Sequence, residues 1–352
     1  MMLQISFLMK YFLVLIPIEK EFIMNKKISS LVMALGLGVS IAGFASANEN
    51  LIVYTSMKES LIGALKTKFA EKHPEVAMDY QSAGAGKLMA KIAAEKESGK
   101  IMADIIWTSE VPDFFKMKEN GMLEPYISKE VENIVNPLPD FDGSFTPIRL
   151  GTLGLAYNTR FVKNPPSEWA DILGKEYKGA FGIANPALSG TSYMSVALLK
   201  STFGWEFFEQ IKANKGKVGK GSGQVVDDTA SGDLLASLAV DYITNDKIKK
   251  GAQLKLVYPK EMLVIPSPAA IFKGTKNLTA AQKFVDFLLS DDAQKIVANE
   301  GTLPVRKGVA VMDGMPSVED AMQRAIPIDY NAILNEKEET VKKFSQILQN
   351  RN

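Results

Sequence analysis

A unit that recurs along the first third of the chain constrains the fold most: a short apolar run, a turn of hydroxyl or glycine residues, and then a helical pattern. Apolar runs bounded by turn residues are typical of buried strands. After the first run, Leu61, Leu65 and Phe69 fall on one helix face that extends to about Lys72. Alternating strands and helices of this kind predict an α/β fold built on doubly wound sheets. The three runs are residues 51–54, 76–80 and 105–107.

The rest of the chain continues the alternation less regularly, from about residue 147 onwards. Residues 149–158 are expected to form one or two extended segments, and residues 263–272 are expected to be extended around two prolines. Further strands are expected within 177–184 and at 225–226, 239–243 and 254–258. Helices are expected at 193–199, 232–238, 280–289 and 292–298, and over most of 316–352.

Hydroxyl and glycine residues follow the expected strands at four places. In open α/β sheets, ligands lie beyond the carboxyl ends of strands, and helix N-termini offer free N–H groups and a partial positive charge to an anion. Serine and threonine are also good helix caps, so one such turn alone favours capping. Four of them favour a shared anion site. The turns are Thr55-Ser56, residues 82–86, Thr108-Ser109 and Ser189-Gly190-Thr191.

The N-terminus has the pattern of a secretory signal peptide. Lys26 and Lys27 follow Met24, residues 31–44 are apolar, and Ala45-Ser46-Ala47 is a small-residue cleavage pattern. The apolar stretch is shorter than the roughly 20 residues that a spanning helix needs. We therefore expect residues 24–47 to be removed, residues 1–23 to lie upstream of the true translation start, and the mature protein to be periplasmic.

Composition excludes several classes of function. The chain has no cysteine, one histidine and a formal net charge of +1. Disulfides, thiolate metal sites and a cysteine nucleophile are therefore excluded, and a Ser-His-Asp triad has only His73 to draw on. Without a long basic block we expect no nucleic-acid partner. Residues 82–86 also lack the Gly-Lys-Ser/Thr of a nucleotide-binding loop. We expect neither an enzyme nor a cofactor or resident metal. A secreted phosphoester-processing enzyme and a sensory module with the same fold remain alternatives.

Six segments of the sequence resemble the solute-binding proteins that serve ABC importers for ferric iron, phosphonates and sugar phosphates. The resemblance implies the two-lobed type II periplasmic binding fold, with two crossing hinge strands that join lobe 1 (48–147 plus 262–310) to lobe 2 (148–261 plus 311–352). It also implies a monomer that closes on a ligand and delivers it to an ABC permease and ATPase. The segments are 51–56 (LIVYTS), 103–107 (ADIIW), 154–158 (GLAYN), 185–191 (NPALSGT), 284–294 (FVDFLLSDDAQ) and 301–306 (GTLPVR).

Within that resemblance, the residues favour an anion over iron. Ferric-binding members use a histidine after the first strand, an acid after the third and a pair of tyrosines. Here Met57 and Lys58 stand at the first place, Ser109 precedes Glu110 at the second, and one tyrosine follows Asp241 at the third. Iron stays the alternative, with Glu110, Asp241 and Tyr242 as its donors.

The resemblance to phosphonate and sugar-phosphate binders implies a phosphoryl group surrounded by strand-end residues. Asp241 would hold the other end of the ligand, either a sugar hydroxyl or the ammonium of an aminoalkylphosphonate, and Glu261 is a second candidate. The alternative for Asp241 is a solvated strand-end acid. The expected phosphoryl contacts are Thr55, Ser56, Ser82, Gly84, Thr108, Ser109, Ser189, Gly190 and Thr191.

Overall fold

The fold is taken from a computed structural model that describes residues 49–138 and 141–349. The expected upstream extension (1–23) and signal peptide (24–47) lie outside the described residues, so both stay predictions. The described residues belong to one compact unit. Among them, every helix is too short or too polar to cross a membrane.

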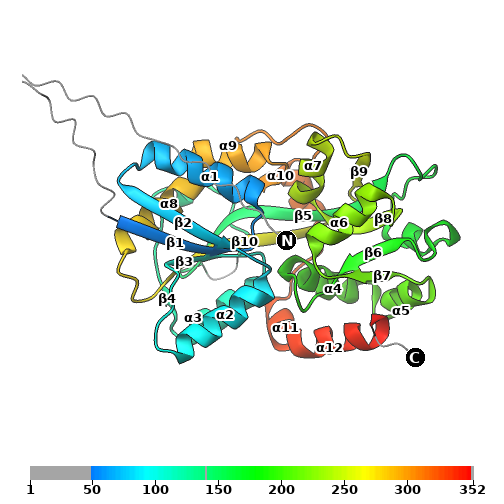
Figure 1. Ribbon diagram of the computed structural model, residues 1–352, viewed down its shortest axis with the longest axis horizontal. Coiled ribbons are helices and arrows are strands. Elements are labelled where there is room, and N and C mark those ends of the chain that lie inside the picture. The colour runs from blue at the N-terminus through cyan, green and yellow to red at the C-terminus, as the bar shows by residue number, and fades with distance from the viewer. Residues whose placement is uncertain (1–48, 139–140, 350–352) are drawn as a thin grey trace, which may run out of the picture. The chain divides into compact units, whose positions relative to one another are not determined.

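Two long antiparallel strands form the centre of the sheet, β5 (Thr146–Asn158) and β10 (Leu263–Phe272) (Figure 1). All residues of both strands are buried. On one side of this pair lie three mutually parallel strands, which form the first half of the sheet: β3 (Ile105–Trp107), β1 (Glu49–Thr55) and β2 (Val76–Ser82). On the other side lie three more, the second half: β8 (Ala236–Val240), β6 (Phe181–Ala184) and β7 (Lys217–Gly219).

Three short strands complete the sheet and show how the central pair connects its halves. One end of β5 pairs with β11 (Leu303–Pro304), and its other end pairs with β8 and β9 (Leu254–Val257). The end of β10 pairs with β3 and with β4 (Leu123–Glu124). Each central strand therefore runs from one half into the other. The predicted fold class, two doubly wound lobes joined by crossing strands, is confirmed, while the residue boundaries of the lobes stay predictions.

Helices cover both halves. Phe69 shows how they pack, since its ring is fully buried and lies edge-on to Phe284, 5.0 Å away between centroids. The first half carries α1 (Glu59–Lys72), α2 (Ala85–Glu97), α3 (Val111–Glu119), α8 (Leu278–Leu289) and α9 (Asp291–Asn299). The second half carries α4 (Gly190–Phe203), α5 (Glu206–Ala213), α6 (Ser222–Ser231) and α7 (Asp241–Lys249). Short 3₁₀ turns lie at η1 (Val131–Asn133), η2 (Trp169–Leu173) and η3 (Lys175–Tyr177).

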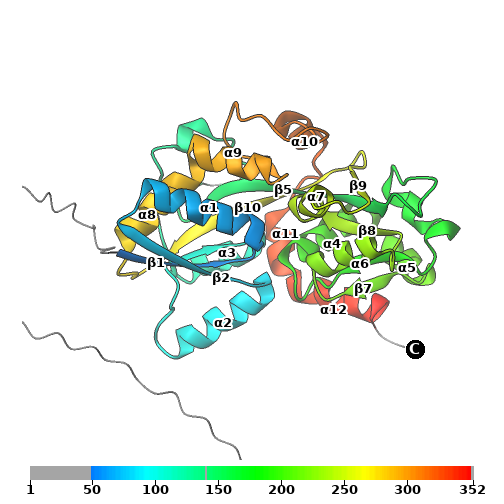
Figure 2. The same cartoon turned by 45° about the horizontal axis from the view of Figure 1, so that its top comes forward.

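The C-terminal helices lie against both halves. These are α10 (Val318–Arg324), α11 (Tyr330–Asn335) and α12 (Lys337–Leu348). Helix α11 packs on α3 of the first half, whereas α12 packs on α4 and α5 of the second, and both views show α12 along the second half (Figure 2). The expectation that this segment is mostly helical and packs on the second lobe is correct for α12, and α11 adds a contact to the first.

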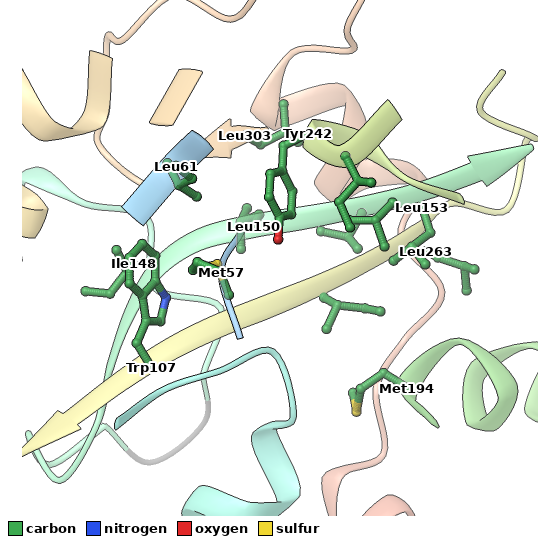
Figure 3. Close-up of a cluster of buried hydrophobic side chains, with 14 of the residues drawn as sticks. Met57, Leu61, Trp107, Ile148, Leu150, Leu153, Met194, Tyr242, Leu263 and Leu303 are labelled. Atoms are coloured by element: carbon green, nitrogen blue, oxygen red, sulfur yellow. The ribbon is translucent and has the colours of Figure 1, made fainter. Parts of the chain in front are cut away.

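Between the halves, the central strands are covered by apolar side chains from both. Figure 3 shows Met57 and Tyr242 beside Leu150 of β5, with Trp107 close to Met57. These four side chains are at most 2% exposed. The Trp107 indole donates a hydrogen bond to the carbonyl of Ser267 at 3.2 Å. Trp107 is therefore a core residue.

Three local expectations in the second half are wrong. The strand expected at 239–243 ends at Val240, and residues 241–243 form the first turn of helix α7. Val225 and Val226 lie in helix α6 and not in a strand, because they and Thr229 together form its buried face. Gly232 ends that helix and does not open another one. Its φ of +94° is the left-handed conformation that commonly terminates helices. The residues after it form strand β8.

Candidate functional site

A cavity of about 290 Å³ lies where the two halves meet, at the carboxyl ends of the parallel strands. Residues from the turn after β3 and from the turns before α1 and α2 line it on one side, and the starts of α4, α6 and α7 line it on the other. Each of the four strand-end turns named from the sequence contributes at least one residue to this cavity. Seven of the predicted residues line the cavity: Ser56, Gly84, Ser109, Ser189, Gly190, Thr191 and Tyr242.

Helix N-termini surround this cavity. The first turns of α2, α4, α6 and α7 contribute to the wall, as does the residue before α1. The first N–H groups of a helix have no acceptor within that helix, and the helix dipole places a partial positive charge there. Several such ends around one small cavity create a strong preference for an anion.

Three hydroxyl groups form a cluster on the second-half wall. Ser222 Oγ lies 2.9 Å from Ser189 Oγ and 3.1 Å from Thr191 Oγ1, and the last two are 3.1 Å apart. Ser189 also caps α4 by accepting from the backbone N–H of Ser192 at 3.4 Å. Ser189 therefore caps helix α4 and also contributes its hydroxyl to the cavity wall. Hydroxyl protons can rotate, so the cluster can turn donors towards an anionic oxygen.

Three lysines on the wall have no ionic partner. Lys58 and Lys87 come from the first half and Lys220 from the second. Within residues 49–138 and 141–349, no carboxylate lies within ion-pair distance of any of the three, and the cavity wall includes no aspartate or glutamate. Lys58 reaches across to the second half, since its Nζ lies 3.7 Å from where a Cβ on Gly223 would be.

Sequence reasoning noticed these lysines without assigning them to the site. In the sequence, Lys58 stands where ferric-binding proteins have a histidine. Lys87 follows Gly86 as in a nucleotide-binding loop, and Leu88, in place of a hydroxyl residue, is the departure from that loop. Lys220 belongs to a Gly/Lys-rich stretch, residues 214–223. For Lys58 and Lys87 the available signal is their position directly before, or within the first turn of, a predicted helix. Lys220 precedes α6, a helix that the sequence did not predict.

Arg149 on β5 is a further cation of the wall, although its side chain is only 1% exposed. Its guanidinium donates to Thr302 Oγ1 at 2.7 Å and to Ser109 Oγ at 3.3 Å. It lies 3.7 Å from Asp241 Oδ1 and stacks on the Tyr242 ring, 4.8 Å from the centroid. The arginine thus holds the wall residues Ser109 and Tyr242 in place. In the sequence it could have been recognised as a charged residue within an otherwise apolar predicted strand.

Asp241 is placed differently from both sequence-based interpretations. It is fully buried and does not line the cavity, so it is neither a solvated acid nor a wall residue. Burial raises the pKa of its carboxyl, against the opposing effect of Arg149 and of hydrogen bonds. The carboxylate accepts from the Thr152 N–H at 2.8 Å and from Thr302 Oγ1 at 2.7 Å.

Four other predicted residues also stand off the wall. Thr55 Oγ1 accepts from the Met57 N–H at 3.1 Å, and Ser82 Oγ donates to the Met57 carbonyl at 2.7 Å, so both hold the first strand-end turn. Thr108 is fully buried with its hydroxyl unpartnered. Glu261 lies elsewhere, where its carbonyl accepts from the Trp169 indole at 2.9 Å.

The donors expected for iron do not converge. Glu110 is ion-paired with Lys337, Asp241 is ion-paired with Arg149, and only Tyr242 reaches the cavity. In the described part of the chain, no group of three histidine, aspartate or glutamate side chains is arranged to hold a metal. The wall is cationic, which suits an anion.

Comparison with known proteins fits this geometry. Residues 100–334 match the family model described as bacterial extracellular solute-binding protein. The chain belongs to this family. A solute-binding protein of Actinobacillus pleuropneumoniae, AfuA, solved with fructose 6-phosphate, superposes with a TM-score of 0.76 at 22% identity over 86% of this chain and 99% of AfuA.

Two more similar proteins show how widely ligands vary around this fold. Iron-bound HitA from Pseudomonas aeruginosa has a TM-score of 0.72 at 22% identity, covering 85% of this chain and 99% of HitA. A Salmonella typhimurium periplasmic protein, named as a candidate 2-aminoethylphosphonate-binding protein, is 24% identical over 68% of this chain and 72% of its own length. The likeness to AfuA and HitA confirms the type II periplasmic binding fold of this solute-binding protein.

Proposed function

We propose that this protein is the periplasmic solute-binding component of an ABC importer and captures a small phosphorylated or phosphonate anion by closure of its two halves. The observation that carries the proposal is the cavity between the halves, where helix N-termini, the hydroxyl cluster and unpaired lysines meet. Export through the predicted signal peptide, delivery to a permease and ATPase, and action as a monomer without covalent chemistry are parts of the same proposal.

Closure follows from the placement of the groups on both sides. Ser56 and Ser109 belong to the first half, whereas Ser189 and Ser222 belong to the second. A ligand that contacts both halves stabilises the conformation in which they approach, and an importer can recognise that conformation. Hydrogen bonds to a charged group contribute about 1.5–3 kcal/mol each. A few of them suffice for micromolar affinity, which corresponds to about −8 kcal/mol.

The test is a ligand panel with matched serine variants. Titration calorimetry with inorganic phosphate, fructose 6-phosphate, 2-aminoethylphosphonate and ferric citrate identifies the ligand class. For any phosphoryl or phosphonate ligand, we expect Ser189→Ala to raise Kd about tenfold, which is about 1.4 kcal/mol. Ser201→Ala, on the same helix but outside the cavity, should leave Kd unchanged. Tight binding of ferric citrate, with no binding of the phosphorus compounds, would favour the iron alternative.

A further inference from the structure

We propose that the ligand of this cavity carries a second anionic group besides its phosphoryl or phosphonate group, and no ammonium. The inference rests on the proposed function and adds the chemical class of the ligand's other end. It comes from counting the charges on the wall and from locating the acids that surround it.

The second-half wall is sufficient to hold one phosphoryl group. There the N-termini of α4 and α6 meet at the hydroxyl cluster, and Lys220 directly precedes the N-cap of α6, Gly221. Backbone N–H groups, hydroxyls that can rotate, and one lysine ammonium can together donate hydrogen bonds to all the oxygens of one phosphoryl group.

Two cations remain on the first-half wall once that group is placed. Lys58 precedes α1, and Lys87 lies in the first turn of α2. A phosphoryl group carries about −1.5 to −2 at pH 7, whereas the three unpaired lysines carry three positive charges. Arg149 adds a fourth, which Asp241 offsets from 3.7 Å. A lone phosphoryl group therefore leaves positive charge unneutralised beside the helix N-termini of α1 and α2.

An ammonium on the ligand would meet no acid. Asp241 and Glu110 are both adjacent in sequence to wall residues. Asp241 is committed to Thr152, Thr302 and Arg149 behind the wall. Glu110 is 2% exposed and ion-paired with Lys337 outside the cavity wall. An ammonium that faces the unpaired lysines would be repelled by them, so the cavity selects against aminoalkylphosphonates. A carboxylate at that end would instead pair with Lys58 and Lys87.

Three phosphonates of similar length test this directly. They are 3-phosphonopropionate, with a carboxylate at the far end, 2-aminoethylphosphonate, with an ammonium, and propylphosphonate, with neither. By titration calorimetry we expect 3-phosphonopropionate to bind at least tenfold more tightly than propylphosphonate, and 2-aminoethylphosphonate to bind most weakly. The double variant Lys58→Met/Lys87→Met should reduce the tenfold preference to about twofold or less. Lys220→Met should weaken all three ligands, and exposed Lys178→Met, outside the cavity, should change none.

The outcomes separate this inference from the proposed function. If the phosphonates bind but 2-aminoethylphosphonate is as tight as 3-phosphonopropionate, the second anionic group is refuted and the anion site stands. A carboxylate preference that survives in the double lysine variant also refutes it. If none of the three binds at millimolar concentration although inorganic phosphate or fructose 6-phosphate does, this inference is refuted and the proposed function stands. If no phosphorus compound binds, both fall together.

Discussion

Lys337 neutralises two buried carboxylates, and its replacement by methionine tests how the C-terminal helix is held against the first half. Its Nζ lies 2.8 Å from Asp113 Oδ1 and forms an ion pair with Glu110. Glu110 and Asp113 are only 2% and 5% exposed, and one oxygen of Asp113 has no hydrogen-bond partner. Removing one partner of a buried ion pair costs about 3–5 kcal/mol, because the remaining charge is uncompensated. We expect Lys337→Met to lower the free energy of unfolding by that amount near pH 8.

The pKa of Glu110 determines how the stability of the folded protein changes with pH. Burial, with repulsion from Asp113, raises the pKa of Glu110 to about 7 from an ordinary value of 4.5, although Lys337 acts in the opposite direction. The folded protein therefore binds a proton more readily than the unfolded chain between these values, and stability falls as pH rises through that window. A shift of this size corresponds to about 3 kcal/mol. Without Lys337 the pKa of Glu110 rises further above 7. The part of the stability loss that comes from Glu110 is therefore absent well below pH 7, where the carboxyl is protonated with or without Lys337, and it grows as pH rises above 7.

Urea unfolding at pH 8 and pH 5.5 measures both effects. Lys342→Met is the matched control, because Lys342 is exposed on the same helix and has no ion pair among the described residues. We expect Lys337→Met to lower the free energy of unfolding at pH 5.5 by less than half as much as it does at pH 8. Adding Glu110→Gln should restore part of the stability at pH 8. An equal loss at both pH values, or a loss no larger than that of Lys342→Met, would refute the reasoning.

Two further predictions concern the closed arrangement and the buried arginine. Gly86→Ala places a methyl group 2.6 Å from the carbonyl oxygen of Ala187 in the other half, so ligand Kd should rise at least tenfold in titration calorimetry. Gly63→Ala, whose new Cβ meets ordinary contacts at 3.6 Å, is the control, and equal affinity in both variants contradicts the prediction. Arg149→Met should cost about 3–5 kcal/mol in urea unfolding, because it leaves Asp241 buried without its cation. Additional Asp241→Asn should recover part of that loss, and a loss under about 1 kcal/mol would contradict it.

Local patterns were enough to predict the elements of the first half. The stripe of Leu61, Leu65 and Phe69 predicts a helix face, and all three side chains are buried in α1. The run 105–107 predicts a buried strand and forms β3. In both cases the period of the apolar residues matches that of a single element, so no distant contact is needed to decide between helix and strand.

The errors in the second half come from information that local patterns do not contain. Adjacent β-branched residues such as Val225 and Val226 favour a strand, but α6 packs them against β5, β6 and β8. Gly232 is equally consistent with a helix start and a helix end. Only its positive φ decides for the end. Tertiary packing outweighed local propensity at the two valines, whereas backbone conformation decided the ambiguous glycine.

Site residues that follow the ends of parallel strands could be predicted from the sequence. Those whose position depends on long-range contacts could not. Ser56, Ser109 and Ser189 reach the cavity because the carboxyl ends of parallel strands share one edge. Asp241 also follows a strand, but its side chain turns back towards β5 and Thr302, which no spacing in the sequence reveals.

The glycines of residues 82–86 show why a ligand motif and a closure motif are hard to separate by sequence. Glycine, which has no side chain, lets backbone N–H groups approach an anion closely, and Gly84 does line the cavity. A Cβ on Gly84 or Gly86 would, however, lie 2.5 Å from the carbonyl oxygen of Leu188 or 2.6 Å from that of Ala187, both in the second half. Any other side chain there would hold the two halves apart. In this turn, the lack of a side chain at Gly84 and Gly86 both exposes backbone N–H groups to the ligand and lets the second half approach closely. Ligand affinity and closure of the two halves therefore depend on the same two glycines.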